Sequence, residues 1–94
     1  RILQLGDSGN DVLALQRYLN FIAETYPSIP KVTEDGDYGP ATDAAIRAFV
    51  TEFELPYDPS RVSAALWYAI TNIYDDLYSG GNVAEGQFPG TTIS

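Results

Sequence analysis

Three stretches of the chain repeat apolar residues at the spacing of one helix face, with proline and glycine between them. In the first stretch, over 11–26, the apolar positions recur at steps of three and four: Val12, Leu15, Leu19, Ile22 and Tyr26. This period is typical of an α-helix that buries one side. Similar patterns predict helices over 40–54 and 63–78. Three such helices with short connections predict an all-α fold, a compact orthogonal three-helix bundle.

Turn-forming residues set the ends of these predicted helices. Ser8 and Asp11 have the spacing of a capping box, so Ser8 is expected to cap the first helix. Pro40 suits the first position of the second helix. Glycines at 80 and 81 are expected to end the third helix. The apolar residues of the extended lead-in, at 2–5, are expected to pack on the bundle.

The length of 94 residues suits one domain with its own core. We expect the bundle to span 1–79 and the polar, glycine-bearing segment 80–94 to be a linker or irregular tail that contributes little to stability. The inward helix faces predict the core residues: Val12, Leu15, Leu19, Ile22, Ile46, Phe49, Val50, Phe53, Leu66, Trp67, Ile70 and Ile73.

Composition excludes several kinds of chemistry. The chain has no cysteine and no histidine, which removes disulfides, thiolate zinc sites and the commonest general base. Asp35 and Asp37 begin like a calcium loop, but Gly39, Pro40 and Ile46 stand where the remaining EF-hand positions would be. We therefore expect no metal, no cofactor and no catalytic residue, and an enzyme is disfavoured.

The formal net charge is −8, which argues against nucleic acid and anionic membranes as partners. Much of the acidity lies in 31–58, where seven acidic residues stand against two basic ones. This segment is either a solvated face that aids solubility or a surface for a cationic or mixed-charge partner.

The most specific local pattern is the segment 35–40, Asp-Gly-Asp-Tyr-Gly-Pro. Its two glycines predict a tight turn with positive φ at one or both, directly before a helix. The backbone N–H groups of such a corner, together with the helix N-terminus, are suited to receive a carboxylate. Tyr38 and Tyr57 lie in loops, where each ring can either pack on the protein or stack on a sugar.

Two spaced motifs resemble the peptidoglycan-binding type 1 domain, a small three-helix module attached to bacterial cell-wall hydrolases. The segment from Leu5 to Asn20 is similar to the first family motif, G-x-x-G-x-D-V-x-x-L-Q-x-x-L. The segment from Asp35 to Phe49 is similar to the second, D-G-x-F-G-x-x-T-x-x-A-V-x-x-F. The chain departs from the family in the second loop, 57–62, which lacks the usual glycines.

The resemblance implies non-catalytic binding of bacterial cell-wall peptidoglycan, which tethers a larger cell-wall-active protein to its substrate. The implied partners are the glycan strand and peptide stem, and other domains of the parent protein, including a tandem copy. We expect an extracellular or cell-wall location and a monomer that binds neither nucleic acid nor membrane. The alternative is a protein–protein interaction or regulatory domain of a multidomain bacterial protein.

Loops that flank a helix N-terminus bring polar groups together. This places the expected ligand-binding residues around the glycine turn and in the second loop. They are Asp35, Tyr38, Gly39, Thr42 and Tyr57.

Overall fold

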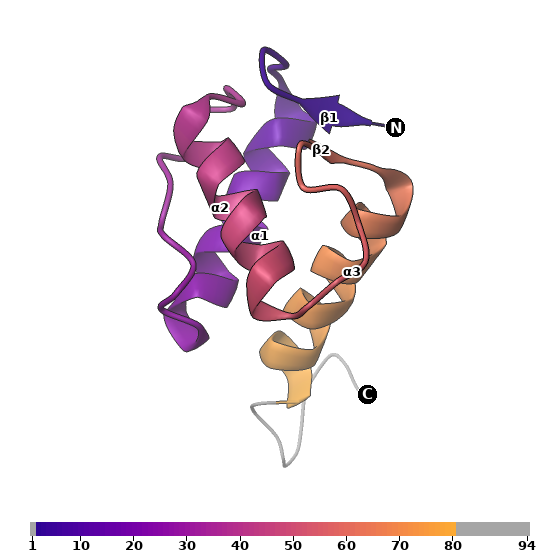
Figure 1. Ribbon diagram of the computed structural model, residues 1–94. Coiled ribbons are helices and arrows are strands. Elements are labelled where there is room, and N and C mark those ends of the chain that lie inside the picture. The colour runs from indigo at the N-terminus through magenta and orange to yellow at the C-terminus, as the bar shows by residue number, and fades with distance from the viewer. Residues whose placement is uncertain (1, 81–94) are drawn as a thin grey trace.

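The computed structural model describes residues 2–80, and within them three α-helices, one strand pair and a final π-helical turn (Figure 1). The predicted three-helix fold is confirmed, with each helix boundary within three residues of the expected one. Of the predicted tail over 80–94, Gly80 belongs to the final helical turn, and 81–94 lie outside the described residues. The elements are β1 (Leu3–Gln4), α1 (Asn10–Thr25), α2 (Pro40–Glu52), β2 (Arg61–Val62), α3 (Ala64–Asp75) and η1 (Asp76–Gly80).

The start of α1 differs from the expected capping box. Gly9, with φ 125°, is the N-cap residue, and no side chain caps it. Ser8 instead pairs with Asp37 in an isolated antiparallel bridge. The Gly9 N–H donates to the Gly36 carbonyl at 2.9 Å. The turn before α1 is therefore fixed by the turn before α2, a distant partner that a local capping pattern does not reveal.

The other two helices begin as expected from their turn residues. Pro40 is the first residue of α2, where its missing N–H leaves no bond unmade. Ser63 caps α3, because its hydroxyl accepts from the Leu66 N–H at 3.3 Å. After Asp75 the hydrogen bonding changes to the π-helical turn η1, so the third helical segment reaches Gly80.

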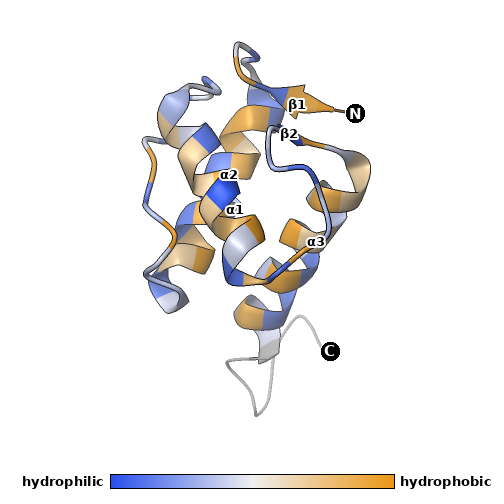
Figure 2. Ribbon diagram, in the orientation of Figure 1, coloured by the Kyte–Doolittle hydropathy of each residue, from blue (hydrophilic) through white to orange (hydrophobic). Residues whose placement is uncertain are grey.

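The core lies where the inward faces of the three helices meet. Figure 2 shows hydrophobic and hydrophilic residues alternating along α1 and α2, as expected for helices that bury one side. Most of the predicted core is buried, whereas Phe53, Trp67 and Ile73 are only partly buried at its edge. Further buried residues come mainly from outside the predicted stripes: Leu3, Ala23, Ile29, Val32, Tyr38, Ala45 and Val62.

The lead-in joins the bundle through one side chain. Leu3 is buried at 2% exposure and pairs in register with Val62, which makes β1 and β2 an antiparallel two-stranded sheet. Ile2 and Leu5 are 54% and 53% exposed, contrary to the expectation that they pack on the bundle. The alternation of a strand explains the exposure of Ile2, because neighbouring side chains point to opposite faces. Leu5 lies beyond β1, in the turn that follows it.

Candidate functional site

Gln16, a buried residue of α1, organises the glycine turn that precedes α2. Its Oε1 accepts from the backbone N–H groups of Asp35 at 3.0 Å and Gly36 at 2.8 Å. Its Nε2 donates to the Asp37 carbonyl at 2.9 Å and to Thr42 Oγ1 and Asp35 Oδ1, both at 3.1 Å. A buried amide is costly unless it is bonded, so this arrangement holds one turn conformation.

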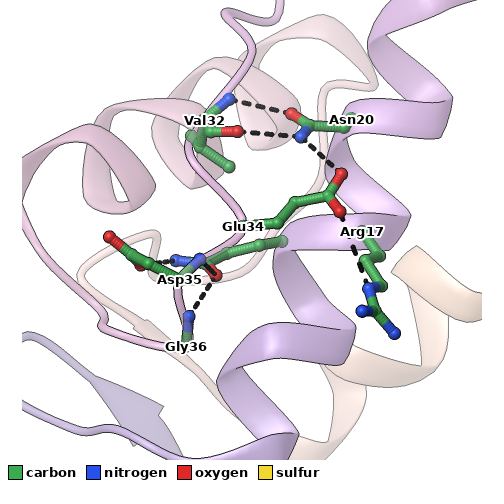
Figure 3. A network of polar contacts seen from close by, with 7 residues as sticks. Arg17, Asn20, Val32, Glu34, Asp35 and Gly36 are labelled. Carbon is green, nitrogen blue, oxygen red and sulfur yellow. Dashed lines mark hydrogen bonds and ion pairs between the residues drawn. The ribbon is translucent and has the colours of Figure 1, made fainter.

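Asn20, one helical turn further along α1, holds the preceding part of the same loop (Figure 3). Its Oδ1 accepts from the Val32 N–H and its Nδ2 donates to the Val32 carbonyl, both at 2.8 Å. The same Nδ2 donates to Glu34 Oε2 at 2.9 Å. Arg17 also pairs with Glu34, at 3.6 Å between Nε and Oε1. The segment 32–36 is thus fastened along one side of α1.

The structure brings some of the predicted ligand residues together but buries two of them. Asp35 and Thr42 meet at Gln16. Tyr38 and Thr42 are each only 2% exposed, so their side chains offer little surface to a ligand. Asp35 is exposed, whereas Gly39 and Tyr57 are half-buried. Direct contact of the five residues with a ligand stays a prediction, for which Asp35, Gly39 and Tyr57 retain accessible surface.

The glycine turn does not present the free N–H groups expected for an anion site. The N–H groups of residues 35–39 all donate within the protein. Their acceptors are Gln16 Oε1, which takes two of them, Asp35 Oδ1, Asp7 O and Asp37 O. The donors of the turn itself are therefore used to fix the loop, and binding of a carboxylate at the N-terminus of α2 stays a prediction.

Asp35 adds a negative charge to this turn. The hydrogen bond from the Asp37 backbone N–H, and next the one from the Gln16 side-chain amide, hold the pKa of Asp35 below its usual value. The side chain is therefore ionised at neutral pH. An exposed carboxylate here favours an uncharged or cationic part of a ligand over another carboxylate.

Tyr38 lies under the turn as a neutral packing group. Burial, with a further contribution from the charge of Asp43, raises the pKa of Tyr38 to about 12. Within residues 2–80, no group hydrogen-bonds the Tyr38 hydroxyl or Asp43 Oδ1. The other oxygen of Asp43 accepts from Arg47 Nε at 2.9 Å, and this bond raises the pKa of Arg47. Of the packing and sugar-stacking roles left open for this ring, the structure favours packing.

A hollow of about 430 Å³ lies between α1 and α3, away from the predicted residues. Tyr18 and Phe21 of α1 face Tyr74 of α3, with ring centroids 4.7 and 5.0 Å from that of Tyr74. We call it the aromatic groove, and its lining is Asn10, Leu13, Ala14, Arg17, Tyr18, Phe21 and Tyr74. The sequence places these aromatics on helices, but their meeting depends on how α1 packs against α3.

The described part of the chain shows neither a metal centre nor a membrane span. Between residues 2 and 80, no group of three or more acidic, histidine or cysteine side chains is arranged to hold a metal ion. The helices in this range are also too short or too polar to cross a bilayer.

Comparison with known proteins identifies the family. The family model described as "Putative peptidoglycan binding domain" matches residues 8–70, which include α1, α2 and the first part of α3. The solved structure of the SleB N-terminal domain is similar, with a TM-score of 0.64 and 30% identity over 79% of this chain and 93% of that chain. No curated protein sequence matches. The chain thus belongs to the peptidoglycan-binding domain family, as its two motifs predicted.

Proposed function

We propose that this domain binds bacterial cell-wall peptidoglycan without catalysing a reaction and tethers a larger cell-wall-active protein to its substrate. The observation that carries the proposal is the family match over 8–70, because it covers most of the first motif and all of the second and reaches into all three helices. The similarity to the SleB N-terminal domain over most of both chains supports it. The corresponding location is outside the cell, at the cell wall or envelope.

The rigid first loop supports a binding role. Gln16 and Asn20 hold residues 32–37 before any ligand arrives, so little conformational entropy is lost on binding there. Asp35, Gly39 and Tyr57 are proposed to contact the wall directly. Thr42, through Gln16, and Tyr38, from beneath the turn, are proposed to support that surface.

The affinity of one copy is expected to be modest. The net charge of −8 gives no long-range attraction to a polymer that also carries carboxylates. Linkage to other domains of the parent protein, including a tandem copy, would raise the effective concentration at the wall. We propose that the domain itself is a monomer.

One observation favours the second candidate function, a protein–protein interaction or regulatory domain. Ile2 and Leu5, at the start of the fold, are both more than half exposed. Two large apolar side chains near one end of a domain suit contact with a neighbouring domain. Such a contact is compatible with wall binding elsewhere on the surface.

Co-sedimentation tests the proposed function. The 94-residue chain is mixed with insoluble peptidoglycan from several species, with insoluble cellulose as the control polymer. We expect the chain to pellet with peptidoglycan and to stay in solution with cellulose. A chain that stays soluble with every peptidoglycan, yet is retained by other domains of its parent protein, supports the interaction function instead.

A further inference from the structure

We propose that the aromatic groove holds the glycan strand of peptidoglycan and that Arg17, in its lining, pairs with a carboxylate of the attached peptide stem. This inference rests on the proposed wall binding and assigns a surface to it. The groove lies on the side of α1 that faces α3, so it uses none of the five residues expected from the loops.

The ring arrangement suits a sugar. Tyr18, Phe21 and Tyr74 are each half-buried, so part of each side chain remains accessible. Tyr74 is inclined by 49° to Tyr18 and by 63° to Phe21, so these rings do not cover one another face to face. Aromatic rings pack against the C–H face of a sugar, while phenol hydroxyls can bond its hydroxyl and acetamido groups.

The size and lining of the groove agree with this ligand. Its volume of about 430 Å³ lies within the usual range for small-molecule sites, roughly 300–1,000 Å³. Apolar side chains make most of its lining, and Asn10 and Arg17 add polar groups. A few polar groups in a largely apolar hollow are the usual means of orienting a sugar-sized ligand.

Charge separates this groove from the rest of the acidic surface. Arg17 is the one charged residue among the described residues that line it, in a chain with net charge −8. The glycan backbone is uncharged, whereas its peptide stems carry carboxylates. The groove therefore offers neutral packing for the strand and a single cation for a stem.

Arg17 is free to change partners at little cost. Its side chain is 64% exposed, and its contact with Glu34 is long, at 3.6 Å. Exposed ion pairs of this kind contribute little to stability. Glu34 keeps its bond from Asn20 when Arg17 turns away. The Arg17 guanidinium can thus be exchanged onto a ligand carboxylate without leaving Glu34 unbonded.

The segment 32–36 lies beside two residues of the groove lining, Leu13 and Arg17. Glu34 is joined to Arg17, and a Cβ added at Gly36 would lie 3.9 Å from Leu13 Cβ, with Leu13 itself lining the groove. A strand in the groove would therefore bring its stem close to the segment 34–36.

A second hollow provides the comparison. It lies along α2, has a volume of about 390 Å³, and is lined by Ser28, Arg47, Ala48, Thr51 and Glu52. It has no aromatic ring, and its arginine is held by Asp43 at 2.9 Å. Its chemistry does not suit a sugar face, so it serves as the control site.

The first experiment fills each hollow with the same side chain. Ala14→Gln fills the aromatic groove, and Ala48→Gln fills the second hollow; both alanines are half-buried helix residues. Binding of the full chain is measured to insoluble peptidoglycan and to soluble stem-bearing glycan fragments, after thermal melts show that each variant is folded. We expect Ala14→Gln to weaken binding about tenfold or more and Ala48→Gln to leave it unchanged.

A second pair of variants tests the rings directly. Tyr74→Leu removes a groove ring, whereas Tyr68→Leu removes a tyrosine of the same helix that is 67% exposed and outside the lining. We expect about tenfold weaker binding for the first and no change for the second. Arg17→Gln should weaken binding of stem-bearing fragments while leaving stem-free N-acetylglucosamine oligomers unaffected.

The outcomes separate the site from the function. If wild-type chain binds peptidoglycan and the folded groove variants bind equally well, the groove is not the site and the proposed function stands. If the wild-type chain does not bind peptidoglycan, the proposed function itself fails. Tight binding of synthetic stem peptide alone, unchanged by Ala14→Gln, would also overturn the assignment. So would a wild-type dimer that Ala14→Gln converts to a monomer, because a second copy would then occupy the groove.

Discussion

The two loops that join the helices are held in different ways. The first, over 26–39, takes its conformation from α1, where Gln16 and Asn20 bond its backbone at several points. The second, over 53–60, contains a turn that its own residues hold: Asp58 Oδ1 accepts from the Ser60 N–H at 2.9 Å and from the Ser60 hydroxyl at 2.8 Å. It then enters the short strand β2.

This difference determines where each loop is vulnerable. The first loop depends on residues far away in the sequence, so a substitution on a helix should disorder it. The second depends on a local turn, so its changes should stay local. The family motifs agree with this division, because the first loop retains the Asp-Gly pattern and the second has lost its glycines.

The largest expected effect comes from Gln16→Ala. The change leaves the N–H groups of Asp35 and Gly36 without their acceptor and creates a cavity in a buried site. We expect the free energy of unfolding to fall by about 3 kcal/mol. Urea denaturation measures this loss, and amide hydrogen exchange should show faster exchange across 32–39.

Arg17→Ala is the control for that variant, since the neighbouring side chain is exposed and its ion pair is long. It should change stability by less than about 0.5 kcal/mol. A loss below about 1 kcal/mol for Gln16→Ala would contradict the comparison, because the first loop would then hold itself without α1.

The next effect separates the two glycines of the turn. Gly36 has φ 76°, and a Cβ there would lie 3.3 Å from the Gly9 carbonyl oxygen. Gly39 has an extended φ of −107°, and an added Cβ would meet nothing within 4 Å. The expectation of positive φ at one or both positions is thus met at Gly36 alone. Thermal or urea unfolding should show a loss of about 2 kcal/mol for Gly36→Val.

Gly39→Val is the matched control, with an expected loss below about 1 kcal/mol. The sequence predicted positive φ at one or both positions, because two glycines in four residues do not reveal which one has it. Equal losses in the two variants would mean that the turn is sensitive for a reason other than backbone conformation.

Helix positions were predictable from sequence because apolar spacing determines which face is buried, as Leu15, Phe49 and Ile70 show. The cap expected at Ser8 is absent, since Ser8 pairs with Asp37 from another turn. The role of Gln16 was likewise hidden, although the residue stands in the first motif. From the sequence alone, a polar residue beside an apolar stripe is expected to be exposed. Its burial becomes evident only when its hydrogen-bonding partners are known.

The candidate site was hard to predict for the same reason, because it depends on contacts between segments that are distant in the sequence. Tyr38 and Thr42 were expected at the ligand surface because they flank a helix start, yet the packing of the first loop buries both. The aromatic groove was missed because Tyr18 and Tyr74 are far apart along the chain. Regular spacing predicts which face of a helix is apolar, but not which aromatic rings from two helices share a surface.

Tyr38→Phe tests whether the first loop is supported from below by packing alone. Near pH 7 the change should alter stability by less than about 1 kcal/mol, because the buried hydroxyl has no bonding partner among residues 2–80. Burial raises the pKa of Tyr38 to about 12, from 10 when exposed. The unfolded chain therefore loses this proton first as the pH rises.

It follows that wild-type stability is retained below pH 10 and falls relative to Tyr38→Phe as the pH rises from about 10 to about 12. The difference should reach at most about 2 kcal/mol. Urea denaturation at several pH values measures it, and the variant cancels the contribution of the other tyrosines. A constant difference across this range would show that the hydroxyl reaches solvent.

Asp58→Ala should give the smallest effect and sharpen the contrast between the loops. The hydrogen bond from the Ser60 backbone N–H, and next the one from the Ser60 hydroxyl, hold the pKa of Asp58 below its usual value. The wild-type advantage over Asp58→Ala should therefore be present above about pH 4 and be lost as the pH falls further.

Because the turn is exposed and local, we expect the melting temperature to drop by no more than about 4 °C at pH 7. Faster amide exchange should stay within 57–62, and spread of that change into 32–39 would show that the two loops are coupled rather than independently held.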